Sequence, residues 1–180
     1  MTSAAISRRQ FLRGDLSGKR RAIRPPWARD EAAFAESCTR CGDCIVACPE
    51  SILVLGAEGY PTVDFRRGDC SFCAECADRC TSGALRRPKG VTPPWTLRAE
   101  FGERCLNTRG VVCSSCAEYC EAGAIRIRPR VGGAGQPEID PALCNGCGAC
   151  YRPCPVEAIA LNYRNEPVDS NQQNAVRASA

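Results

Sequence analysis

The chain has 180 residues, a formal net charge of +4 and no histidine, which excludes zinc sites and catalytic relays that depend on imidazole. No stretch approaches the ~20 consecutive apolar residues of a membrane-spanning helix, so no membrane span is expected. Sixteen cysteines stand beside only five Phe, two Trp and one Met. This balance indicates small domains that are stabilised through their cysteines rather than by a large apolar core.

The chain begins with a basic tail, residues 1–23. Residues 1–29 hold eight of the 24 basic residues but one of the 20 acidic residues. Arg8 and Arg9 lie in a stretch that looks like a twin-arginine export signal, but the apolar segment that should follow is missing. We therefore expect a cytoplasmic protein whose basic tail precedes an acidic body, an asymmetry that suits electrostatic docking. Nucleic-acid binding is not expected, because the basic residues gather in one short tail.

The elements predicted for residues 24–88 are short. Residues 30–37 favour a helix of one or two turns with Asp30 as its N-cap. The apolar run Leu53-Val54-Leu55 predicts a strand that pairs with residues 61–65.

Residues 92–164 repeat this pattern. Apolar and polar residues alternate from Trp95 to Phe101, which predicts a half-buried strand. Residues 125–127 and 159–161 predict two further strands, and residues 136–140 a partner strand. One short helix is expected after the third cysteine of each group described below. Residues 165–180 are expected to form a flexible polar tail.

The sixteen cysteines form four groups. Two groups have the spacing C-x2-C-x2-C-x3-C-P, a third has the same spacing without the proline, and the fourth has seven residues in its first gap. They are Cys38, Cys41, Cys44 and Cys48; Cys144, Cys147, Cys150 and Cys154; Cys70, Cys73, Cys76 and Cys80; and Cys105, Cys113, Cys116 and Cys120. The first spacing is that of bacterial ferredoxins, so we expect [4Fe–4S] clusters rather than zinc or disulfides. Gly42, Gly146 and Gly148 lie inside these groups, where tight turns need positive φ.

The two halves of the chain are duplicates. Pro25-Pro26-Trp27 matches Pro93-Pro94-Trp95, and a Gly-x-Pro motif lies between the cysteine groups of each half at Gly59 and Gly135. The duplication predicts an α+β protein of two tandem bacterial ferredoxin-like domains, residues 24–88 and 92–164, each with two [4Fe–4S] clusters.

In bacterial ferredoxins three cysteines of one group bind one cluster, and the fourth binds the neighbouring cluster. This rule predicts four crossed sets: Cys38, Cys41, Cys44 and Cys80; Cys70, Cys73, Cys76 and Cys48; Cys105, Cys113, Cys116 and Cys154; and Cys144, Cys147, Cys150 and Cys120. Uncrossed ligation is the alternative, above all for the group with the long gap.

The long gap, Leu106 to Val112, admits two interpretations. A longer loop could expose its cluster and make it labile, as a transferable cluster would need to be. Alternatively, it is a surface loop whose length is tolerated.

Several segments together resemble the NapF family, the ferredoxin-type proteins of periplasmic nitrate reductase systems. They are the arginine pair, Arg24-Pro25-Pro26-Trp27, Cys38-Thr39-Arg40-Cys41, Gly59-Tyr60-Pro61, Cys70-Ser71-Phe72-Cys73, the third cysteine group, and residues 144–150. The resemblance implies a cytoplasmic four-cluster protein that binds the precursor of the nitrate reductase catalytic subunit before export and assists its maturation by cluster insertion or reduction.

The alternative is an electron-transfer subunit that relays electrons to a redox partner. An enzyme is not expected, because the chain has no histidine and no cysteine outside the four groups. The sequence leaves the oligomeric state open.

Overall fold

The computed structural model describes residues 22–87 and 94–164. Contacts divide them into two compact units: residues 22–64 with Ala74–Arg86, and Phe65–Cys73 with residues 87 and 94–164. The arginine pair at Arg8 and Arg9, and the tail predicted at 165–180, lie outside the described residues.

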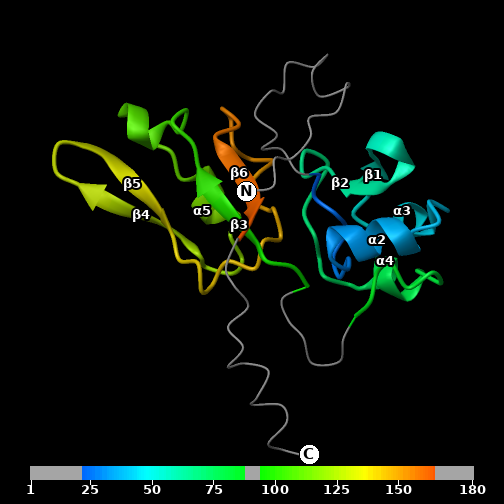
Figure 1. The fold of residues 1–180 in the computed structure, drawn as a ribbon. Helices are drawn as coiled ribbons and strands as arrows, with labels where there is room; N and C mark the ends of the chain where they lie inside the picture. Colours follow the sequence, from blue (N-terminus) through cyan, green and yellow to red (C-terminus); the bar gives the residue numbers. More distant parts are fainter. Residues whose placement is uncertain (1–21, 88–93, 165–180) are drawn as a thin grey trace, which may run out of the picture. The chain divides into compact units, whose positions relative to one another are not determined.

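The first unit is built from short elements around one two-stranded sheet (Figure 1). They are α2 (Glu31–Ser37), α3 (Asp43–Val46), β1 (Leu53–Leu55), the 3-10 turn η1 (Ala57–Gly59), β2 (Pro61–Val63) and α4 (Glu75–Asp78). β1 and β2 are antiparallel, with Leu53 opposite Val63. The predicted N-cap is confirmed, since an Asp30 carboxylate oxygen accepts the Ala33 N–H at 3.0 Å.

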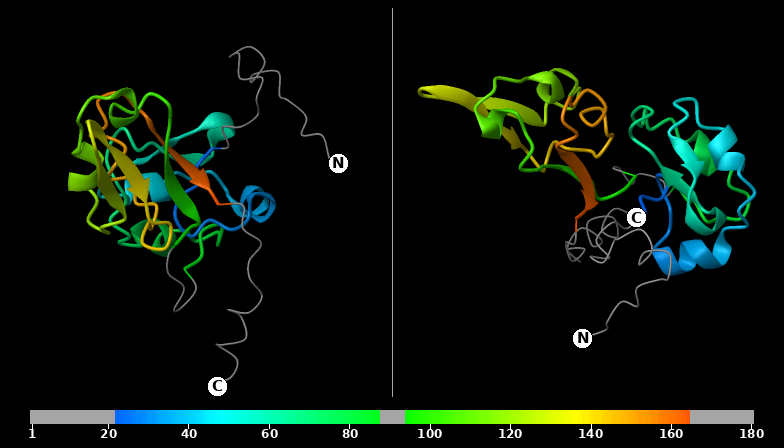
Figure 2. Two further views of the ribbon diagram at one scale, coloured as in Figure 1. Left: turned by 90° about the vertical axis from the view of Figure 1, so that its left-hand side faces the viewer. Right: turned by 90° about the horizontal axis from the view of Figure 1, so that it is seen from above.

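The second unit has two two-stranded antiparallel sheets. Its elements are β3 (Leu97–Phe101), the 3-10 turn η2 (Asn107–Arg109), α5 (Ser115–Glu118), β4 (Ile125–Arg130), β5 (Gly133–Ile139) and β6 (Ile159–Tyr163). β3 pairs with β6, and β4 with β5. Figures 1 and 2 show the β4–β5 hairpin extending away from the β3–β6 pair. The strands predicted from the apolar patterns are therefore present, although β4, β5 and β6 are longer than expected and β2 and β3 are shorter.

Each core includes the two adjacent apolar residues, here called an apolar couple, that lie shortly after each fourth cysteine. All eight residues of these couples are buried: Ile52 and Leu53, Ala84 and Leu85, Ala124 and Ile125, and Ala158 and Ile159. Phe34 of α2 fills the first core, and Leu97 of β3 the second. The two tryptophans of the Pro-Pro-Trp segments are also buried. Burial at the same offset in all four places brings the end of each cysteine group against a core.

The prediction of a helix after each third cysteine was wrong in detail. α3, α4 and α5 each begin one residue before the third cysteine, and the fourth group has only turns there. The physical reason is Pro153. In the first group the Ala47 N–H donates to the Asp43 carbonyl at 2.9 Å, whereas Pro153, at the corresponding position, has no N–H to donate.

The segment Phe65–Cys73, which the sequence assigns to the first domain, packs within the second unit. Its Phe65 and Phe72 rings meet Trp95 edge-on, with centroids 6.0 and 6.3 Å away. The predicted domain limits, 24–88 and 92–164, stay a prediction. No helix among the described residues combines the length and apolar character that crossing a membrane requires.

Candidate iron–sulfur sites

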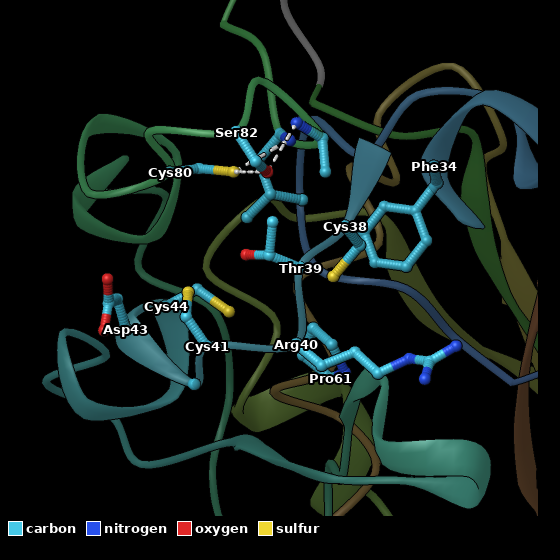
Figure 3. A pocket seen from close by; sticks show the side chains of 13 residues that line it. Phe34, Cys38, Thr39, Arg40, Cys41, Asp43, Cys44, Pro61, Cys80 and Ser82 are labelled. Atoms are coloured by element: carbon cyan, nitrogen blue, oxygen red, sulfur yellow. Dashed lines mark hydrogen bonds between the residues drawn. The ribbon is translucent and has the colours of Figure 1, made fainter. Parts of the chain in front are cut away.

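The first predicted ligand set lines one pocket in the first unit. Cys38, Cys41 and Cys44 come from the loop and helix after α2, and Cys80 from the end of α4. Figure 3 shows their side chains around the pocket, which has a volume of about 340 Å³. The structure thus brings Cys80, and not Cys48, to the first three cysteines of the chain.

The turn that follows Cys80 lowers the pKa of its thiol. The Leu85 N–H donates to the Cys80 sulfur at 3.3 Å, and the Ser82 hydroxyl lies 3.5 Å from it. Burial acts to raise the pKa of the Cys80 thiol, but these hydrogen bonds outweigh it and the pKa is lowered. Only a thiolate binds iron, so this turn favours ligation. Ser82 was not singled out from the sequence.

The third predicted ligand set lines a corresponding pocket of about 330 Å³ in the second unit. Cys105, Cys113, Cys116 and Cys154 all face it, and Phe101 and Ile159 close its apolar side. The Ala158 N–H donates to the Cys154 sulfur at 3.2 Å, which parallels the bond at Cys80. Cys154 rather than Cys120 joins the group with the long gap, so the arrangement favours crossed ligation there too.

The third cysteine of every group is buried. Cys44, Cys76, Cys116 and Cys150 each expose less than a tenth of their surface. Burial first, and neighbouring thiols second, raise the pKa of Cys44 and of Cys116 to about 11. Cys44 and Cys116 therefore hold neutral thiols at neutral pH until a metal displaces the proton.

Cys150, a member of the fourth set, lies near thiols of both the third and the fourth set. Its pKa rises to about 12 through burial and then through Cys147, Cys144, Cys116 and Cys120 nearby. Burial also raises the pKa of Cys147, with smaller contributions from Asp69, Cys120 and Cys144. Cys120 thus lies within electrostatic range of the group with which the crossed rule pairs it.

The contacts do not place the four cysteines of the second set within one unit. By their contacts Cys48 and Cys76 belong to the first unit, and Cys70 and Cys73 to the second. This ligand set stays a prediction.

The donor set fits a cluster. None of the sixteen cysteines, all of which the structure describes, forms a disulfide. Among the described residues no group of three or more His, Cys, Asp or Glu side chains could hold a single metal ion. Instead, each pocket has four thiols around a cavity, the ligand number and type of a [4Fe–4S] cube.

Comparison with known proteins gives the family. A profile described as "4Fe-4S dicluster domain" matches residues 37–84 and 111–158. "Ferredoxin-type protein NapF" of Escherichia coli K12 is 45% identical over 157 residues, which cover 87% of this chain and 94% of that protein. The chain belongs to the NapF family. NapF of Haemophilus influenzae is 40% identical over 172 residues, covering 90% of this chain and 97% of the relative.

A more distant relative carries a different name. "Methylamine utilization ferredoxin-type protein MauM" of Methylophilus methylotrophus is 34% identical over 169 residues, covering 77% of this chain and 69% of MauM. The description "ferredoxin-type" is thus shared by relatives other than NapF.

The resemblance and the fold class are confirmed: this NapF-family chain is α+β, with two dicluster domains in tandem. Sixteen cysteines in two such domains hold four [4Fe–4S] clusters, as predicted. The clusters supply one-electron redox chemistry. The second profile match begins at residue 111 and leaves out Cys105, so the long gap is where this chain departs from the common pattern.

Proposed function

We propose that this protein is a cytoplasmic iron–sulfur protein that binds the precursor of the periplasmic nitrate reductase catalytic subunit. It would assist maturation of that subunit by inserting a cluster or by reducing one. The observation that carries the proposal is the similarity to two NapF proteins over nearly their whole lengths, compared with lower identity and coverage for MauM.

We also propose the four crossed ligand sets. For two of them the support is a pocket lined by all four cysteines, Cys80 completing one and Cys154 the other. For the set of Cys144, Cys147, Cys150 and Cys120 the support is that Cys144 and Cys120 lie close enough to contribute to the raised pKa values of Cys147 and Cys150. The set of Cys70, Cys73, Cys76 and Cys48 follows from the crossed rule.

The geometry supports a carrier rather than an enzyme. Each pocket is lined by four cysteines and by apolar side chains such as Phe34 or Phe101. What these residues do is bind iron, keep water from one side of each site and donate a backbone N–H to the fourth sulfur.

The test is to mix the cluster-loaded protein anaerobically with the catalytic subunit precursor purified without its cluster. The proposal expects a complex, followed by a gain of iron or of activity in the precursor. The iron-free protein at equal concentration is the control for the gain. Absence of both binding and gain would contradict the proposal.

A second candidate is electron relay, favoured by the four clusters and by the printed description "ferredoxin-type". In that case the reduced protein oxidises on contact with the mature partner, whose iron content does not change. Transfer to the mature partner without any effect on the precursor would decide for the relay.

A further inference from the structure

The long gap in the third cysteine group is a folded loop. Leu106–Val112 contains η2, and its backbone turns back on itself through bonds from Arg109 N–H to the Cys105 carbonyl at 3.2 Å and from Val111 N–H to the Leu106 carbonyl at 2.9 Å. The Thr108 hydroxyl donates to the Cys105 carbonyl at 2.7 Å, and η2 packs beside β5. Residues 108–112 of the loop are exposed, whereas Leu106 is half-buried and Asn107 is buried.

Asn107, the second residue of this loop, is the one buried polar residue among those that the structure describes, with 6% of its surface exposed. Its side-chain amide nitrogen donates to the Cys113 carbonyl at 2.5 Å. Its amide oxygen accepts the Cys113 N–H at 3.2 Å. One side chain therefore satisfies both backbone groups of a predicted cluster ligand.

The two hydrogen bonds restrain the backbone of Cys113 in the way that hydrogen bonds from a neighbouring β-strand would. A side-chain amide that bonds both the N–H and the C=O of one residue restrains its position and its orientation. Asn107 also lines the pocket that Cys105, Cys113, Cys116 and Cys154 share. In the first group the chain itself imposes this restraint, because only Thr39 and Arg40 separate Cys38 from Cys41.

We propose that Asn107 is a positioning residue for the third cluster: it holds Cys113 in place for ligation and replaces the restraint that a two-residue gap gives elsewhere. The inference rests on the ligand set proposed above for this cluster, and it does not depend on the partner protein. It also changes the interpretation of the long gap, because a loop tied to its ligand by a buried amide is neither loose nor free to vary in sequence at that position.

The test uses Asn107→Ala and Asn107→Leu in the full-length protein loaded with all clusters. Loss of a residue that orients a metal ligand typically weakens metal binding about 10- to 100-fold. Under mild oxidation or chelation we expect one cluster to lose iron faster by a factor in that range while the others keep their rate. The reduced-state EPR signal of that cluster should shift as well. Asn162→Ala, at an exposed site on β6, is the control and should leave all four unchanged.

The leucine variant separates hydrogen bonding from packing. Leucine fills the space of the amide but forms no hydrogen bond with the Cys113 backbone. The third cluster should therefore lose iron as fast in Asn107→Leu as in Asn107→Ala. Three results would each overturn the inference. They are an unchanged rate of iron loss in Asn107→Ala, a normal rate of iron loss in Asn107→Leu, and an equal increase in iron loss from all four clusters. Cys113→Ala tests the ligand set by itself: retention of all four clusters in that variant would refute the set, whatever the Asn107 variants do.

Discussion

Arg24, the first residue of the Arg-Pro-Pro-Trp segment, links the start of the first unit to its core. Its guanidinium lies 5.0 Å from the centroid of the Phe34 ring and 5.1 Å from that of Tyr60. It also donates from Nε and Nη2 to the Glu31 carboxylate. A cation between two rings and a carboxylate is stabilised by both. Arg24, the residue immediately before the duplicated Pro-Pro-Trp segment, is thus a structural anchor of the first unit.

We expect Arg24→Ala to destabilise the first unit by about 1–2 kcal/mol, the scale of a partly buried cation–π contact together with a charged hydrogen bond. The measurement is the thermal midpoint of the cluster-loaded protein under anaerobic conditions. Glu31→Ala and the double variant complete a cycle in which the effects should be less than additive. Strict additivity would show that the pair does not interact.

Asn107 and Ser82 show what the sequence could not supply at this scale. Neither belongs to a cysteine motif, and an Asn or a Ser in a turn is ordinary. Their roles follow from folding, which brings Asn107 against Cys113 and Ser82 against Cys80. The cysteines themselves were predictable because their spacing along the chain is set by the cluster they surround.

At the scale of elements, the short strands and the apolar couples were predictable because burial follows local apolar pattern. The fourth helix was not formed, and Pro153 was the signal that could have shown this. The packing of Phe65–Cys73 within the second unit had no local signal. It depends on contacts of Phe65 and Phe72 with Trp95, which lies far along the chain.

Gly148 marks where this segment packs. It has φ +88°, and a Cβ there would lie 2.0 Å from the Phe65 ring. Nearby, the Cys70 N–H donates to the Cys147 carbonyl at 2.8 Å. A side chain at Gly148 must therefore displace either the Phe65 ring or the loop that carries Cys147 and Cys150.

Gly148→Ala should cost about 1–2 kcal/mol for the backbone conformation and about 1–3 kcal/mol for the overlap. We expect a lower thermal midpoint and partial loss of one cluster, measured by iron content. Gly132→Ala is the matched control: its φ is +72° and nothing lies within 4 Å of the added Cβ, so it should cost the backbone share alone. Equal effects of the two variants would show that Phe65 does not pack there.

At the scale of the whole molecule, the duplicated halves have diverged while keeping their cluster pockets. The second has the β3–β6 sheet, with Phe101 opposite Ile159. The first has only an isolated bridge between Ala28 and Leu85 at the corresponding place. Common to both is a fourth cysteine whose sulfur accepts a backbone N–H, at Cys80 and Cys154. The constraint that survived duplication is therefore that of the clusters.

Removal of iron should unfold much of both units, because ligation supplies folding free energy that such small cores lack. Anaerobic chelation followed by circular dichroism should show loss of ordered structure, with recovery on reconstitution. An unchanged spectrum in the iron-free protein would mean that the cores suffice alone.

The central claim is crossed ligation: each cluster takes three ligands from one cysteine group and its fourth from the other group in the same half of the chain. Iron and sulfide contents of paired variants test this claim most directly. Cys38→Ala and Cys80→Ala should each lose one cluster, and their combination should lose no more, because both ligate the same one. Cys38→Ala combined with Cys48→Ala should lose two. The reverse pattern, with two clusters lost in the first pair and one in the second, would contradict crossed ligation.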